Sequence, residues 1–347
     1  MDERAFILET RLMHASPVGT VWTGAAVWFL CYGVFLACAA WSAVPLVAGL
    51  DDEIGLSDDA WTALCMSLLW WSILSFGEYA RRGGLADAVA LQSAGVPVDT
   101  GELKTLAEGP SRAARRRAAA FGAVGTFVGL VFFAMNYHPE SHLLDPSAMT
   151  ATNVWFLVMT MTLFMALFRR LSFLREDTAA FIRDGGAGMK IDLLDISKLD
   201  GFGRIALRGA VPWLVTGTLV LLMLLGRQTT ELFVALIVLL VASAIVVFAW
   251  PMMRIHRLIA DTKAAELARV RQDLAEVRRR FETGGAEAER VGGRLAALLS
   301  LETRIAQARE WPLDVPTAAR FMLFLGIPLA SWAGAGFVNI ALEVLIA

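Results

Sequence analysis

Two histidines and a nearby carboxylate form the most metal-like pattern in this sequence. His138 and His142 are four residues apart, and Asp145 follows closely. If Pro139 opens a short helix, the two imidazoles lie one turn apart and could share a divalent metal ion. The spacing fixes no third ligand, so a pH-sensitive loop and an ordinary polar loop stay open as alternatives.

A second cluster joins one carboxylate to two guanidinium groups. Glu78 is the carboxylate nearest to a membrane interior, and Arg81 and Arg82 follow at three and four residues. Side chains at these spacings meet on a helix surface, so we predict ion pairs at the end of a membrane span. The cluster could be structural, or it could take part in gating or coupling.

Motifs that mark enzymes are absent from the sequence. It contains no HExxH, GxSxG or Walker pattern and no paired zinc-ligand spacing. Residues 185–190 are glycine-rich, but they lack the phosphate-loop spacing and follow no predicted strand, so we interpret them as a linker. Cys31, Cys38 and Cys65 are interpreted as small apolar packing residues. We therefore expect no enzymatic activity and no cofactor.

The composition predicts an all-α, polytopic helical membrane protein. Of 347 residues, 57% are hydrophobic and 18% charged, and the mean hydropathy is +0.58. Soluble proteins average about a quarter charged residues. About seven apolar runs have the roughly 20 residues that a helix needs to cross a bilayer core. These runs are residues 20–49, 60–79, 118–137, 151–170, 209–226, 231–253 and 318–343.

A charged stretch between the last two runs has apolar residues at alternating steps of three and four. This is the a/d pattern of a coiled-coil seam. The seam residues of its first half are Leu267, Val270, Leu274, Val277 and Phe281. Gly284 and Gly285 end this helix, and a second arm of nearly equal length follows. We predict an antiparallel hairpin that packs on itself or on sister subunits.

Four parts of the chain follow from these patterns. They are an N-terminal cytoplasmic or interfacial segment (1–18), a six-helix membrane domain (19–253) with cytoplasmic loops at 80–117 and 169–208, the cytoplasmic hairpin (254–316) and a last membrane segment (317–347). Pro328 and a cluster of small residues around Gly334 leave open whether the last segment crosses the membrane or re-enters.

Basic residues are sorted to one side of the predicted membrane. Of 31 Lys and Arg residues, all except Arg227 lie in residues 1–18, 80–117, 169–208 and 254–320. The positive-inside rule then makes the N-terminus and the hairpin cytoplasmic, in a bacterial inner membrane. Basic flanks of this kind also attract anionic lipid. No pattern predicts binding to nucleic acid.

One predicted span carries a smooth glycine face. Gly122, Gly125 and Gly129 step by three and four, and small faces allow helices to approach closely in lipid. Gly334 belongs to a similar small-residue cluster in the last run. Packing within one subunit, a subunit contact and a pore-lining face all stay open.

Two segments resemble a group of uncharacterised bacterial multi-pass membrane proteins. The first contains Ile191-Asp192-Leu193-Leu194-Asp195, Phe202, Arg204, Ala206-Leu207-Arg208 and Trp213. The second contains Arg309-Glu310-Trp311-Pro312, Pro316-Thr317, Arg320-Phe321, Pro328, Ser331-Trp332 and Gly334. The resemblance implies a membrane architecture with a cytoplasmic hairpin before the last span. It transfers no activity and no functional residue.

Away from their ends, the predicted spans carry no ionisable acid, base or histidine. Coupled carriers, redox pumps and voltage sensors normally need such groups. We therefore predict a homo-oligomeric passive channel whose hairpin assembles or gates it. Its pore or gating candidates are Glu78, Asn136, Asn153, Thr160, Thr162 and Ser331. The alternative is a non-conducting scaffold or sensor that recruits a cytoplasmic partner through residues 254–311.

Overall fold

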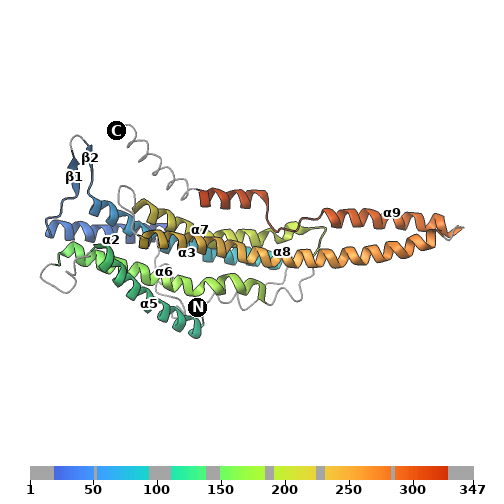
Figure 1. Ribbon diagram of the computed structural model, residues 1–347, viewed down its shortest axis with the longest axis horizontal. Helices are drawn as coiled ribbons and strands as arrows, with labels where there is room; N and C mark the ends of the chain where they lie inside the picture. The colour runs from blue at the N-terminus through green and yellow to red at the C-terminus, as the bar shows by residue number, and fades with distance from the viewer. Residues whose placement is uncertain are drawn as a thin grey trace.

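The computed structural model is an elongated helical bundle from which a two-helix hairpin extends (Figure 1). It describes residues 19–50, 53–93, 111–137, 149–183, 191–223, 231–282 and 286–326. The long helices in these ranges are α2 (Thr20–Trp41), α3 (Asp58–Ser93), α5 (Arg112–Tyr137), α6 (Ala151–Arg183), α7 (Asp200–Met223), α8 (Glu231–Glu282) and α9 (Ala286–Gln307).

Six helices in the described ranges, all of these except α9, are long and apolar enough to cross a membrane. The prediction of an all-α, polytopic membrane protein is therefore confirmed. Of the seventh predicted span, a short apolar helix over Val315–Gly326 is described. The rest of that span lies outside the described residues, together with segment 1–18, the histidine pair His138 and His142, and the positions Ser331 and Gly334.

The first span ends earlier than the sequence predicts. Helix α2 stops at Trp41, and Ala43 adopts the left-handed conformation with φ +52°. The amide of Val44 donates to the carbonyl oxygen of Ala39 at 3.0 Å, which closes the helix end in the manner of a Schellman motif. The expectation that this run is helical to residue 49 is therefore wrong.

A short β-hairpin takes the place of the missing helical turns. Pro45 disfavours helical conformation in the residue before it, so the chain leaves α2 extended. Strands β1 (Val47–Leu50) and β2 (Glu53–Leu56) pair antiparallel, with Val47 opposite Leu56. Apolar composition alone did not separate these residues from the span that precedes them.

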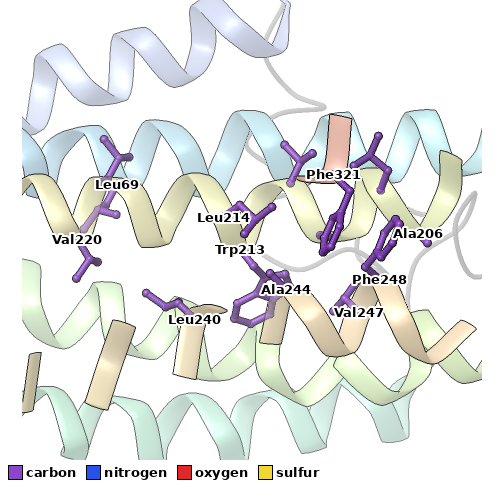
Figure 2. Close-up of a cluster of buried hydrophobic side chains, with 14 of the residues drawn as sticks. Leu69, Ala206, Trp213, Leu214, Val220, Leu240, Ala244, Val247, Phe248 and Phe321 are labelled. Carbon is purple, nitrogen blue, oxygen red and sulfur yellow. The ribbon is translucent and has the colours of Figure 1, made fainter. Parts of the chain in front are cut away.

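The buried core lies between α3, α6, α7 and α8. Within it, Trp213 of α7 lies beside Leu240 and Ala244 of α8 (Figure 2). At its hairpin end, the rings of Phe248 in α8 and Phe321 in Val315–Gly326 stack with centroids 3.8 Å apart. Helices α5 and α6 pack together along the other side of the bundle.

Helix α8 belongs to both the bundle and the hairpin. It is continuous for 52 residues, with Pro251 inside it, so the sixth span and the first hairpin arm are one helix. Helix α9 returns antiparallel along its outer half (Figure 1). The Nε of Arg271 in α8 lies 2.8 Å from Oε1 of Glu302 in α9.

Candidate functional site: the polar junction at the base of the hairpin

Two helices continue past the predicted spans at the hairpin end of the bundle. Helix α3 runs on to Ser93, and α7 already begins at Asp200. They pack antiparallel: Trp61 Nε1 donates to the carbonyl oxygen of Leu222 at 2.8 Å near one end, and charged side chains meet at the other. We call the junction this region of charged side chains at the hairpin end of α3 and α7, together with residues 309–317, which pack on it.

Glu78 is buried at the start of the junction, with its side chain 2% exposed. Arg81 Nε donates to its Oε2 at 2.8 Å, and Arg82 Nε donates to its Oε1 at 2.6 Å. The pairing that the i+3 and i+4 spacing predicts is present. Because both guanidinium groups bind one carboxylate of the same helix, the cluster neutralises a buried charge locally.

Asp87 connects α3 to α7. Its Oδ1 lies 3.2 Å from Nε of Arg204, and its Oδ2 lies 3.2 Å from Nε of Arg208. The Arg208 side chain passes over Gly83, where an added Cβ has no room, and its guanidinium lies 5.6 Å from the ring centre of Tyr79. A single carboxylate, 10% exposed, thus binds two successive turns of α7.

The linker before α7 turns into the junction through Asp195. Ser197 Oγ donates to Oδ1 of Asp195 at 2.5 Å, and Nζ of Lys198 lies 3.1 Å from Oδ2. These two contacts lower the pKa of Asp195 below its usual value, so the carboxylate is ionised at neutral pH. Leu193 and Ile196 on either side of it are buried.

The chain returning from the hairpin packs on the start of α7. A Cβ on Gly203 would lie 3.2 Å from the carbonyl oxygen of Pro312, so the two backbones are in close contact here. Arg309 Nη2 lies 3.9 Å from Oδ1 of Asp200, and Arg309 Nη1 donates to the carbonyl oxygen of Leu313 at 3.4 Å. The start of α7 and residues 309–313 therefore meet in space.

A clamp joins the base of α8 to the same returning segment. Lys263 Nζ donates to Oε1 of Glu310 and to the carbonyl oxygen of Ala308, both at 3.0 Å. The His256 and Trp311 rings stack with centroids 4.3 Å apart and 9° between their planes. His256 Nδ1 also lies 3.0 Å from the carbonyl oxygen of Glu310. These contacts hold the hairpin closed where it meets the bundle.

Three junction carboxylates keep one oxygen without a hydrogen bond. In the described part of the chain, these buried oxygens are Oδ2 of Asp87, which still lies beside Arg208, Oδ1 of Asp200 and Oδ1 of Asp314. No group of three or more His, Cys, Asp or Glu residues in that part could hold a metal ion. The junction consists of ion pairs and packed aromatic rings. These contacts attach the helices to one another by electrostatic attraction and packing.

The described pore candidates do not come together. Glu78 lies in the junction, whereas Asn136 Nδ2 donates to the carbonyl oxygen of Phe132 in its own helix at 2.8 Å. Asn153 lies in the first turn of α6. Thr160 is buried, while the partly exposed Thr162 donates to the carbonyl oxygen of Val158. Their participation in a pore stays a prediction.

The glycine face lies against α6 of the same chain. A Cβ on Gly125 would lie 2.5 Å from the carbonyl oxygen of Phe164, and one on Gly129 would lie 2.9 Å from Cα of Met161. Gly122 meets the Arg169 side chain in the same way. Of the three alternatives left open by the sequence, packing within one subunit is the one observed.

The hairpin seam is buried between the two arms. Val270 and Val277 are 3% and 5% exposed, and Leu267 and Leu274 pack against the same core. The side chain of Phe281 lies outside the described part of the structure. The hairpin therefore packs on itself, and an additional role of these residues in binding a sister subunit or partner stays a prediction.

Comparison of the chain with family models, with curated proteins and with solved structures finds no match. The junction must therefore be interpreted from its own geometry. Sequence reasoning found the pairs around Glu78, because their spacing is local. It missed Asp87 with Arg204 and Arg208, because those partners are more than one hundred residues apart in the chain and no periodicity links them.

Proposed function

We propose that the protein is a non-conducting membrane scaffold or sensor that presents a helical hairpin to a cytoplasmic partner. One observation carries the proposal: α8 is a single helix of 52 residues that serves both the bundle and the hairpin. Leu240 and Val247 are buried in its inner half, and Val270 and Val277 in its outer half. A tilt or rotation of α8 in the membrane therefore moves the hairpin.

The junction attaches the base of the hairpin to α3 and α7, so a movement of α8 is transmitted relative to these helices. Asp87 attaches α7 to α3, and Arg309 and Pro312 attach the hairpin's return segment to the start of α7. Lys263 and Glu310 close the base of the hairpin. Because all three attachments meet at one end of the bundle, a rearrangement of α3, α7 or α8 reaches the hairpin through charged contacts.

The outer surface of the hairpin is the part available to a partner. Its seam side chains face inward, while Arg269, Gln272 and Arg304 are exposed. Charge pairs such as Arg278 with Glu282 run along this surface. A surface that carries both positive and negative charges favours a protein partner with complementary charges. The sorting of basic residues predicts that this surface faces the cytoplasm.

One of the arguments for a channel, the smooth glycine face, has another explanation. The glycine face, which could have lined a pore, is occupied by α6, and the uncharged polar side chains of the described spans mostly bond to their own helices. A passive pore would have to form between subunits of a homo-oligomer.

Flux and cross-linking separate the two functions. Full-length protein in liposomes should pass ions and small solutes no faster than protein-free vesicles. A photo-cross-linking residue at Gln272 or Arg304 should give the same identified adduct in cells and with the purified partner. The same residue at Val270, in the buried seam, is the matched control and should give none. Flux that depends on the protein, without any adduct at Gln272 or Arg304, would establish the channel.

A further inference from the structure

Arginines gather where α5 and α6 leave the apolar part of the bundle. The two helices lie side by side (Figure 1), and a Cβ on Gly122 of α5 would lie 2.9 Å from Cγ of Arg169 in α6. The first two turns of α5 therefore lie close to Arg169. These turns contain Arg112, Arg115, Arg116 and Arg117. We call these four residues and Arg169 the arginine cluster.

Positive charge is in excess around the arginine cluster. Residues 112–122 and 165–175 contain seven arginines and no acidic residue. Glu176 and Asp177 follow in the sequence, and two negative charges balance only part of this sum. Arg112 and Arg116 are exposed and form no ion pair with a residue that the structure describes. The junction differs, because there the arginines bind Glu78 and Asp87.

An exposed apolar strip continues from the arginine cluster along α5. Arg117, Phe121, Val124 and Val131 are separated by four, three and seven residues, so they lie on one face of the helix. Phe121, Val124 and Val131 are 42%, 54% and 41% exposed. From Arg117 to Val131 the face is about 21 Å long at 1.5 Å per residue, which exceeds half of a bilayer core about 30 Å thick.

The strip and the arginines lie at different depths of the membrane. Helix α5 is long and apolar enough to cross a membrane between Arg112 and Asn136, and Arg117 is its last charged residue before the apolar run. The arginines therefore lie at the level of the lipid head groups, and the strip faces the acyl chains. Clusters of four to eight basic residues at the cytoplasmic end of a span are typical of sites for anionic lipid.

We propose that the arginine cluster binds the phosphate of an anionic phospholipid, with one acyl chain of this lipid along Phe121 and Val124. Guanidinium groups suit a phosphate because they donate two parallel hydrogen bonds to its oxygens. The apolar strip next to the arginines favours a lipid over a soluble phosphate. This site is independent of the role proposed for the hairpin, and either can fail without the other.

Native mass spectrometry of the full-length protein tests the site. Detergent-purified protein would be titrated with phosphatidylglycerol or phosphatidylcholine, and the lipid retained per chain would be measured. Phosphatidylglycerol should bind the more tightly, and its apparent Kd should rise about tenfold in the double variant Arg112→Gln with Arg116→Gln. The matched control is Arg254→Gln with Arg257→Gln, which removes the same charge from exposed positions on α8. The control should leave the apparent Kd nearly unchanged.

Equal retention of the two lipids, or an equal loss in the two double variants, would overturn the proposal, because a general attraction depends only on total charge. Sodium phosphate should displace no more phosphatidylglycerol than sodium chloride of the same ionic strength. Greater displacement by phosphate would show a site for free anions and would also overturn the proposal.

Photolabelling of the unaltered protein tests the site without any substitution. Phosphatidylglycerol with a diazirine on one acyl chain, in lipid nanodiscs, should give adducts at Phe121 or Val124 that an excess of unlabelled phosphatidylglycerol reduces. Phosphatidylcholine should compete less strongly. Adducts that appear only on other helices, or equal competition by the two lipids, would contradict the proposal even if the arginine variants did not fold.

Discussion

The contact of α5 with α6 and the contact of α3 with α7 hold helices together by different means. Along α5, Gly122, Gly125 and Gly129 allow the backbones to come close, so dispersion supplies the attraction. Between α3 and α7, Asp87 forms ion pairs with two arginines near the hairpin end. The first contact lies within the span, where charge is costly, and the second lies where water can solvate the arginines.

The contact of α5 with α6 is fixed by its shape, whereas the contact of α3 with α7 can be adjusted by its charged surroundings. A glycine contact depends on shape and has no partner to exchange. An ion pair at the edge of the bundle responds to salt and to competing charges, because its arginines are partly exposed. In the function proposed above, the contact of α5 with α6 is the passive, structural one, and the junction is the contact that transmits movement.

The largest effect is expected from filling the glycine contact. In Gly125→Ala, the new methyl group would lie 2.5 Å from the carbonyl oxygen of Phe164, and backbone cannot move aside as a side chain can. Overpacking of this kind costs about 2–3 kcal/mol. Thermal unfolding followed by tryptophan fluorescence in detergent should show a lower midpoint. An unchanged midpoint would mean that α5 and α6 do not pack this closely.

A smaller effect is expected from breaking the charged contact. Asp87→Asn leaves Arg204 and Arg208 without a carboxylate, and because both arginines are partly exposed the cost should be about 1–2 kcal/mol. The double variant Asp87→Arg with Arg208→Asp restores opposite charges and should recover part of the loss. A double-mutant cycle with no coupling between the two positions would contradict the pairing.

The sequence predicted those features that depend on local spacing. The glycine face, the pairs around Glu78 and the seam at Val270 all follow from steps of three and four residues, and the structure places them on the expected helices. The end of α2 was missed because the left-handed Ala43 leaves no compositional signal. The Asp87 pairs and the stacking of His256 on Trp311 were missed because tertiary packing alone brings such distant residues together.

A stabilising change is expected where a glycine has no close neighbour. Gly293 lies inside α9, and an added Cβ there meets nothing within 4 Å. Gly293→Ala should therefore raise stability by about 0.5–1 kcal/mol, because alanine loses less backbone entropy in a helix. The unfolding midpoint of this variant is the control for Gly125→Ala. A lower midpoint would show that the α9 surface is covered by another element or subunit.

The smallest effect is expected from an exposed ion pair on the hairpin. Arg271 is 66% exposed where it meets Glu302, and such pairs contribute about 0.3 kcal/mol. Arg271→Ala should leave the unfolding midpoint nearly unchanged at high salt and lower it slightly at low salt. A loss as large as that of Asp87→Asn would remove the distinction between the junction and the hairpin surface.

Distance measurements between two spin labels by pulsed electron paramagnetic resonance test most directly whether the ion pairs of the junction hold the base of the hairpin in one position relative to α3. Labels at the exposed positions Ala90 in α3 and Gln272 in α8 would be placed in a full-length protein whose native cysteines are replaced by alanine. A single narrow distance distribution is predicted, and it should broaden in Asp87→Asn. A broad distribution in the protein with Asp87 intact would contradict the account.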